Sequence, residues 1–277
     1  MMKGYANPQL LTTPHELAAA LKSDRKPLVI DLRPAEDFAA GLIPGAVHLD
    51  LWGLSLVDTD PAPLKAFMWI VDHLFNLRGV EATTPVVVYE DNSGMRAARA
   101  FWFLEYLGHQ HAQVLDGGFA AWTGAGLAVT TEAAAPQKST WSGIAQPDRI
   151  ATWRDVRDRL GRSGTVIVDT RSDGEYCGTN VRAKRGGAIP GAVQIEWTRN
   201  LGPDGAFRPA SELRNMYEAA GVTPDKEVVT YCQGGYRAAH AYLALRLLGY
   251  PTVRNYTGSW KEWGDREDLP IETPKVP

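Results

Sequence analysis

Cysteine is scarce in this sequence, which has only Cys177 and Cys232 among its 277 residues. Two cysteines are too few for a disulfide scaffold or for a four-ligand zinc site. The first residues, Met1 to Tyr5, also lack the apolar core of about 7–15 residues that a secretory signal requires. We therefore expect a reduced, cytoplasmic protein with no bound metal.

Long apolar runs and an excess of one charge are missing as well. Runs such as Phe101 to Leu104 fall far short of the roughly 20 residues that cross a bilayer. The 29 basic and 32 acidic residues give a net charge of −3, so no overall positive field is present to hold a nucleic-acid backbone or an anionic membrane. We expect neither nucleic acid nor membrane as a partner.

Apolar residues are plentiful, and they recur in a long internal repeat. The hydrophobic fraction is 44% with nine tryptophans, enough to bury a sizeable core. At an offset of 141, the matching segments are Arg96–Ala98 with Arg237–Ala239, Leu107–Gly108 with Leu248–Gly249, and Trp122 with Trp263. Asp31–Arg33 matches Asp169–Arg171 at an offset of 138, and Ile43–Val47 matches Ile189–Val193 at 146. A period this long indicates a duplicated domain with loop insertions.

The repeat predicts two domains, covering residues 1–135 and 143–277, with a polar linker near Thr131–Ser142. Each half contains two short apolar strands that are followed by helical patterns. The predicted strands are Pro27–Ile30, Pro85–Tyr89, Thr165–Val168 and Val228–Tyr231. Strands that alternate with helices predict an α/β fold with a mostly parallel sheet and helices on both faces. Sites in such folds lie beyond the carboxyl ends of the strands.

The two halves differ at that position. Cys232 follows the second strand of the C-terminal half, whereas the Arg96/Arg237 match puts Asp91 at the cysteine position of the first half, which we therefore expect to be inactive. A cysteine between a strand and a helix N-terminus lies among unpaired N–H groups, which favour its thiolate. Glycines can fold these groups into an anion-binding nest, and an arginine adds a cation. The expected loop comprises Cys232, Gln233, Gly234, Gly235, Tyr236 and Arg237. The simpler alternative is a buried strand-end cysteine beside a plain turn.

On these residues the whole chain resembles the tandem-domain rhodaneses, a sulfurtransferase family with an inactive N-terminal domain and a catalytic C-terminal one. Cys232 resembles the family's persulfide-forming cysteine, and Gln233 to Arg237 resemble the rest of its loop. Ile189–Ala192 resembles the family's Gly-His-Ile-Pro-Gly-Ala block, and Gly258–Trp260 resembles its C-terminal signature. The chain departs from the family at Ala188, where a histidine is usual; we interpret that histidine as structural.

The resemblance implies an enzyme that moves the sulfane sulfur of thiosulfate to cyanide or a thiol through a Cys232 persulfide. The chemistry of the loop agrees, since a thiolate can attack the outer sulfur of thiosulfate and carry it covalently. Loop N–H groups can stabilise the anions involved, so neither a metal nor an organic cofactor is required. The expected partners are a small anionic sulfur donor and the acceptor, and the protein is expected to act as a monomer.

Other charged residues receive expectations of their own. Arg182, Lys184 and Arg185 form a basic cluster, in which Arg182 and above all Arg185 are expected to bind the anionic end of a donor at the pocket mouth. Asp169, Arg171 and Glu175 recur as Asp31, Arg33 and Asp37 in the inactive half, so they are expected to serve the fold. His240 is expected on a helix surface.

Two alternatives stay open at this point, and two others lack the motif that they require. A 3-mercaptopyruvate sulfurtransferase uses the same cysteine with a loop resembling Cys-Gly-Ser-Gly-Val-Thr, whereas Arg237 favours thiosulfate. A phosphatase would need Cys-x5-Arg rather than the Cys-x4-Arg found here. A papain-like protease would need a flanking motif that is missing after Cys232. A non-catalytic binding or sulfur-relay module remains the alternative from another class.

Overall fold

The computed structural model describes residues 3–275 and contains two five-stranded sheets in which every pair of strands is parallel. The first sheet has the order β1-β5-β4-β2-β3 and the second has the order β6-β10-β9-β7-β8. The strands are β1 (Leu11–Thr12), β2 (Leu28–Asp31), β3 (Val47–His48), β4 (Val86–Tyr89), β5 (Ala112–Leu115), β6 (Ile150–Ala151), β7 (Thr165–Asp169), β8 (Val193–Gln194), β9 (Glu227–Tyr231) and β10 (Val253–Tyr256). The identical strand order confirms the duplication and the α/β class.

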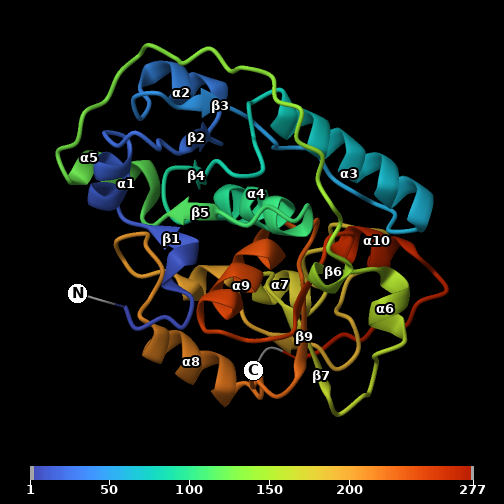
Figure 1. Cartoon of the computed structure of the whole chain (residues 1–277). Helices are drawn as coiled ribbons and strands as arrows, with labels where there is room; N and C mark the ends of the chain where they lie inside the picture. The colour runs from blue at the N-terminus through green and yellow to red at the C-terminus, as the bar shows by residue number, and fades with distance from the viewer. Residues whose placement is uncertain (1–2, 276–277) are drawn as a thin grey trace.

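Within the described residues, ten helices and three short 3₁₀ turns surround these sheets (Figure 1). The helices are α1 (Pro14–Ala20), α2 (Ala35–Ala40), α3 (Pro61–Asn76), α4 (Met95–Tyr106), α5 (Gly118–Gly124), α6 (Trp153–Arg157), α7 (Asp173–Tyr176), α8 (Ala210–Ala219), α9 (Tyr236–Leu247) and α10 (Ser259–Asp265). The 3₁₀ turns are Pro8–Leu10, Pro147–Arg149 and Trp197–Asn200. Helices thus occupy both faces of each sheet, as the resemblance implies.

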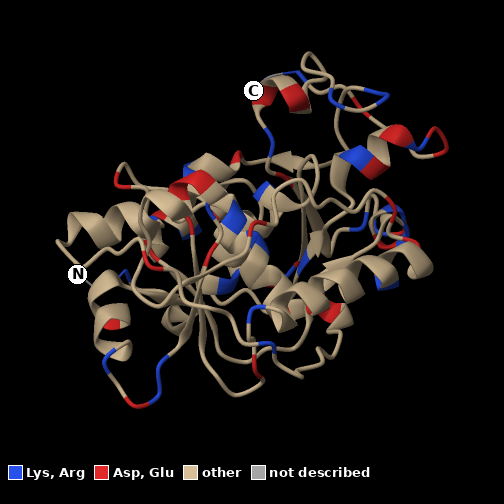
Figure 2. Ribbon diagram, turned by 90° about the horizontal axis from the view of Figure 1, so that it is seen from above, with Lys and Arg blue, Asp and Glu red and all other residues tan. Residues whose placement is uncertain are grey.

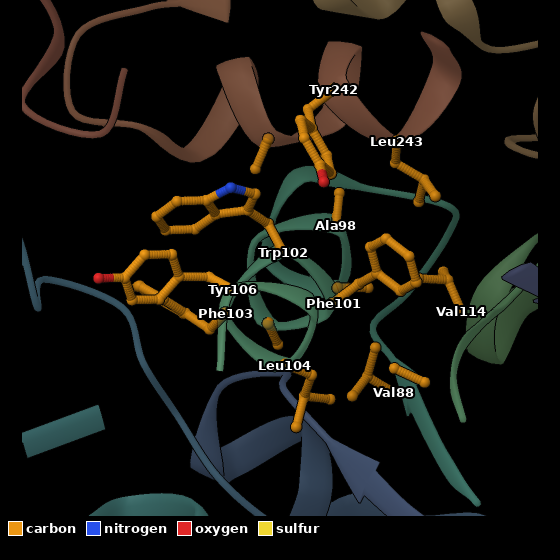
Figure 3. Packing of buried hydrophobic residues seen from close by; sticks show 14 of the residues in the cluster. Val88, Ala98, Phe101, Trp102, Phe103, Leu104, Tyr106, Val114, Tyr242 and Leu243 are labelled. Carbon is orange, nitrogen blue, oxygen red and sulfur yellow. The ribbon is translucent and has the colours of Figure 1, made fainter. Parts of the chain in front are cut away.

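The two domains meet along α4 and α9, which lie side by side at the centre of the molecule (Figure 1). Nine residues of each helix are buried, and a helix that is apolar nearly all round must be covered on every side. Figure 3 shows Phe101 and Trp102 of α4 close to Tyr242 and Leu243 of α9. These residues belong to one hydrophobic cluster that runs through both domains.

Segments at the ends of the domains also cross or follow this boundary. The backbone of Ala6 donates a hydrogen bond to the carbonyl of Leu247 at 3.0 Å, so the start of the described chain lies on the second domain. The expected linker runs along the first domain without regular structure, and Ser139 donates backbone and side-chain hydrogen bonds to Asn76 at 2.9 and 2.7 Å.

A buried ion pair joins the ends of β2 and β7, the neighbours of the middle strands β4 and β9, to the chain that follows each of them. Asp169 is 0% and Arg171 1% exposed, and the guanidinium binds both carboxylate oxygens at 2.5–3.0 Å. Arg171 also donates to the carbonyl of Gly187 at 2.8 Å. Asp31 and Arg33 repeat this pair in the first domain. The expectation that these two pairs serve the fold is confirmed.

The surface agrees with the balanced composition. Figure 2 shows basic and acidic residues interspersed over the ribbon. Across residues 3–275, no helix is both long and apolar enough to span a membrane.

Replacing Arg171 by methionine should lower the free energy of unfolding by about 3–5 kcal/mol, because Asp169 would stay buried without its partner. Urea unfolding monitored by tryptophan fluorescence would measure this. Arg33→Met, in the twin pair, should cost a similar amount. A loss below about 1 kcal/mol, the range of exposed ion pairs, would contradict the structural role.

Candidate functional site

Cys232 lies in the turn between β9 and α9, and only 1% of the residue is exposed. Its Sγ accepts a hydrogen bond from the backbone N–H of Gly235 at 3.1 Å. Gly235 has a φ of +83°, a left-handed conformation that turns this N–H back toward the sulfur. Gly234 does not use a positive φ, so one glycine rather than two gives the loop its fold. The loop thus forms the expected nest of donors around the thiol.

The electrostatics of this turn favour the thiolate. Burial acts to raise the pKa of Cys232, but the Arg237 charge and the backbone N–H groups of Ala238, Gly234 and Gly235 outweigh it, and the pKa is lowered. A depressed pKa marks a nucleophilic cysteine rather than an inert core thiol. The alternative of a plain buried strand-end cysteine therefore does not account for the loop.

Ser259 supports the cysteine from the start of α10. Its Oγ accepts the backbone N–H of Cys232 at 3.0 Å and donates to the carbonyl of Tyr256 at 2.7 Å. Among the described residues it is the one non-glycine with a positive φ, at 55°. Such strain persists where surrounding contacts enforce it, commonly at functional sites. The sequence pattern contained Ser259 in its C-terminal signature but gave it no role.

Above the thiol is a cleft of about 380 Å³ that both domains line. Its walls are Trp52, Gly53, Ser55 and Met95 from the first domain and Arg182, Cys232, Gln233, Gly234, Tyr236 and Arg237 from the second. The Tyr236 hydroxyl donates to the carbonyl of Leu51 at 2.8 Å, and its ring meets the Trp52 ring at 5.1 Å. The sequence did not indicate the first-domain wall, since no motif marks residues 52–55.

Arg237 does not present a free cation to this cleft. Glu175, which follows Arg171 at the start of the short α7, accepts from both of its terminal nitrogens at 2.6 and 2.8 Å. Arg182 contacts the same carboxylate at 3.3 Å, and half of its side chain is exposed. Burial opposes ionisation of Glu175, but Arg237 prevails and lowers its pKa to about 2. The expectation that Glu175 serves only the fold is wrong: it joins the two arginines of the site.

Arg185 lies elsewhere, and its expected position at the pocket mouth is wrong. Its guanidinium donates to the carbonyls of Trp263, Gly264 and Leu269 at 2.9–3.2 Å, and also to that of Arg266. The last carbonyls of a helix lack internal partners, and a guanidinium fork satisfies several at once. Arg185 therefore caps the end of α10, which the sequence pattern could not reveal because the two segments are far apart in the chain.

In the first domain the nucleophile position is occupied by Glu90, so the prediction of Asp91 is wrong. Asp31 pairs with Tyr89 as Asp169 pairs with Tyr231, which makes Glu90 the counterpart of Cys232. The carbonyl of Glu90 accepts the N–H of Phe119, just as that of Cys232 accepts the N–H of Trp260. The loop before Arg96 is one residue longer than its twin, and the Arg96/Arg237 match conceals this insertion.

The side chain of Glu90 enters the nest that its own loop forms. One carboxylate oxygen accepts the N–H groups of Arg96 and Ala97 at 2.6 and 3.1 Å. Burial raises its pKa to about 7, against the opposing effect of these hydrogen bonds. This domain has a carboxyl group, not a thiol, at the donor cluster.

His240 and Cys177 lie outside the cleft. His240 is 0% exposed, and its Nε2 lies 2.7 Å from the carbonyl of Ser93, so the expected surface position is wrong. Cys177 follows α7 and is half-buried. Neither Cys177 nor Cys232 forms a disulfide. Within residues 3–275, no three His, Cys, Asp or Glu side chains gather in a group that could hold a metal ion.

Fold and site together define a duplicated α/β protein with a single activated thiol in an anion-binding loop. The family described as Rhodanese-like domain matches residues 13–125 and 152–266, and the chain belongs to this family. The match includes both domains, as the resemblance predicted.

Named relatives give the class of reaction. The chain is 36% identical to a thiosulfate sulfurtransferase of Pseudomonas aeruginosa, over 98% of this chain and all of the relative, and 36% identical to one of Azotobacter vinelandii over the same shares. A sulfur carrier protein, TtuD, of Thermus thermophilus is 35% identical over 97% of this chain and 98% of the relative. The chain is an enzyme of the sulfurtransferase class.

A solved structure shares the fold. The anaerobic ergothioneine biosynthesis enzyme from Chlorobium limicola has a TM-score of 0.85 at 23% identity, covering 99% of this chain and 72% of that one. At this identity the likeness concerns the fold alone.

The pair of Glu175 with Arg237 should stabilise the protein in a defined pH range. The carboxyl group of Glu175 has a pKa of about 2 in the folded protein and of about 4.3 in the unfolded chain. The contribution is therefore complete above roughly pH 5 and is lost as the pH falls toward 2. Glu175→Gln should cost about 1–3 kcal/mol at neutral pH, and urea unfolding at several pH values should show this difference shrinking below about pH 4.

The exposed pair of Arg208 and Glu212 provides a control. Glu212→Gln should change the unfolding free energy by less than about 0.5 kcal/mol throughout. A Glu175→Gln effect that does not depend on pH would contradict the ion pair as its cause.

Proposed function

We propose that this enzyme transfers the sulfane sulfur of thiosulfate to cyanide or to a thiol acceptor through a persulfide on Cys232. The observation that carries the proposal is the thiol in its donor nest: the Gly235 N–H lies 3.1 Å from Sγ, and the pKa of Cys232 is lowered. The full-length relatives named thiosulfate sulfurtransferase support the choice of donor.

The first step is an attack by the Cys232 thiolate on the outer sulfur of thiosulfate. A bond forms between Sγ and that sulfur while the bond to the sulfonate sulfur breaks, and its electron pair leaves with sulfite. In the second step cyanide or a thiolate attacks the outer sulfur of the persulfide. Thiocyanate or a new persulfide leaves, and the Cys232 thiolate is restored. Each step conserves charge, and neither needs an external oxidant.

The residues of the cleft have distinct tasks in this proposal. The N–H groups of Gly234, Gly235 and Ala238 stabilise the negative charge on Cys232 and on its persulfide. Arg182, with half of its side chain exposed, attracts the sulfonate. Arg237 lowers the Cys232 pKa, but Glu175 already binds two of its donors. Gln233 donates to the carbonyl of Arg182 at 2.8 Å and so orders the cleft wall.

Mercaptopyruvate is the alternative donor, and the position of Arg185 counts against it. The sequence predicts that Arg185 binds the anionic end of a donor, but its guanidinium is bound to carbonyls at and just beyond the end of α10, so it is not available to a ketoacid carboxylate. A pure sulfur-relay role is the second candidate, supported by the similarity to a sulfur carrier protein. We further propose a monomer acting in a reducing cytoplasm, where both free cysteines stay reduced.

Cys232→Ser should abolish sulfur transfer and leave the fold intact, because a hydroxyl does not ionise near neutral pH and cannot carry a persulfide. Intact mass spectrometry after incubation with thiosulfate should show a gain of one sulfur on the wild type and none on this variant. Cys177→Ser should retain both the gain and the turnover. The same assay with mercaptopyruvate compares the donors, and a tenfold or greater preference for mercaptopyruvate would overturn the choice of thiosulfate.

The second step, removal of the outer sulfur by an acceptor, distinguishes an enzyme from a sulfur-relay protein. If thiosulfate loads Cys232 but neither cyanide nor a small thiol removes the sulfur at a catalytic rate, the protein is a carrier.

Arg182→Ala should raise the KM for thiosulfate by roughly one decade, corresponding to the loss of one charge-assisted contact at a half-exposed position. Arg185→Ala removes the same charge from the same segment and is the matched control. It should lower stability, because carbonyls at the end of α10 lose their donor, while KM stays within about twofold of the wild type. Thiosulfate titrations at fixed cyanide would measure both. Equal KM changes would contradict the assignment of Arg182.

A further inference from the structure

Arg99, on α4 of the domain without a nucleophile, is a buried cation with few partners. It is 1% exposed and donates one hydrogen bond, from a terminal nitrogen to the carbonyl of Leu54 at 2.6 Å. Its Nε and its other terminal nitrogen have no hydrogen-bond partner, and it forms no ion pair with any carboxylate of residues 3–275. A buried charge is costly unless a negative charge nearby compensates it.

The guanidinium of Arg99 lies against Tyr236, a residue of the Cys232 loop. Its central carbon is 3.8 Å from the centre of the Tyr236 ring and 4.8 Å from that of Phe103. Tyr236 begins α9, four residues beyond Cys232. Burial lowers the pKa of Arg99 to about 10, and the Cys232 thiolate is among the groups that oppose this shift. Arg99 therefore remains a cation at neutral pH, and the Tyr236 ring that it covers lines the same cleft as Cys232.

The internal symmetry shows that this contact is specific to the active loop. His240 occupies the same place in α9 as Arg99 does in α4. Each reaches across to the loop of the other domain, Arg99 to Tyr236 and His240 to Ser93. Burial lowers the pKa of His240 to about 4, so it is neutral at pH 7. The thiol loop thus faces a buried cation, whereas the Glu90 loop faces a neutral ring.

We propose that Arg99 is a positioning residue of the sulfur-transfer site: its cation stabilises the Cys232 thiolate and persulfide from behind the loop, and its stacking holds the Tyr236 ring. The part that concerns the persulfide rests on the proposed function; the part that concerns the thiolate does not. The domain without a nucleophile thereby supplies charge as well as a wall to the reaction.

Other charges also face Cys232 and its loop, so the effect of Arg99 is partial. They are Arg237 on α9, Arg182 in the segment before Ile189, Glu175 on α7 and Arg96 on α4. These groups are unchanged in a variant of Arg99, and any shift in the titration of Cys232 can be assigned to the missing cation.

The test is the pH dependence of Cys232 alkylation by iodoacetamide in the Cys177→Ser background, which needs no sulfur donor. Arg99→Gln should raise the Cys232 pKa by about 0.5–1 unit, so that alkylation at a fixed pH below the pKa slows roughly three- to tenfold. Arg99→Lys keeps the charge and should restore most of the wild-type profile. Persulfide formation from thiosulfate should slow in parallel in the glutamine variant.

His240→Gln is the matched control, because it alters the same helix pair on the side of the Glu90 loop. It should leave the Cys232 titration unchanged. Arg99→Met serves as a second uncharged variant if Arg99→Gln does not fold. A Cys232 pKa within about 0.2 unit of the wild type in the folded uncharged variant, or an equal shift in His240→Gln, would overturn the role of Arg99. If alkylation shifts as expected but thiosulfate leaves no sulfur on the wild type, the proposed function fails and the charge coupling stands.

Discussion

The packing of α4 against α9 is the contact on which the arrangement of this protein depends. Both helices are buried nearly all round, so neither domain can expose its own helix to water without losing a large apolar surface. Each helix begins at the end of a central strand, where its loop collects unpaired N–H groups. Joining the helices therefore places each loop against the opposite domain, and it makes the thiol cleft a joint product of both halves.

The same loop architecture gives two chemical outcomes in the two domains. In the second domain the donor cluster surrounds a thiol whose pKa is depressed, and space above it remains open. In the first domain a carboxyl group occupies the equivalent position and is held by the N–H groups of Arg96 and Ala97. Its loop packs on the second domain instead: the backbone N–H of Ser93 donates to the Gly205 carbonyl at 2.9 Å, and the Ser93 carbonyl lies 2.7 Å from His240 Nε2. The Glu90 loop is therefore part of the domain boundary.

Under the proposed function, the balance of charges around Cys232 explains how a buried thiol can meet an anionic donor. Arg237 and Arg182 share the carboxylate of Glu175, which fixes the orientation of Arg237 and reduces its net attraction for a dianion. A thiolate of very low pKa is a weaker nucleophile. Because Glu175 partly neutralises Arg237, the arginine favours ionisation of Cys232 without making the thiolate unreactive. Backbone N–H groups supply the remaining stabilisation without adding a mobile charge.

The sequence by itself determined the duplication, the α/β class and the loop around Cys232, because these depend on local patterns: apolar strands, a strand-to-helix turn, and a glycine at position 235. It could not determine contacts between segments far apart in the chain. Folding within the second domain brings Arg185 to the end of α10 and Glu175 to Arg237. Packing of the two domains brings Trp52 and Arg99 against Tyr236. The sequence also could not show that Glu90, rather than Asp91, is the counterpart of Cys232. Matching the helices conceals a one-residue insertion in the loop, and only the pairing of the strands reveals it.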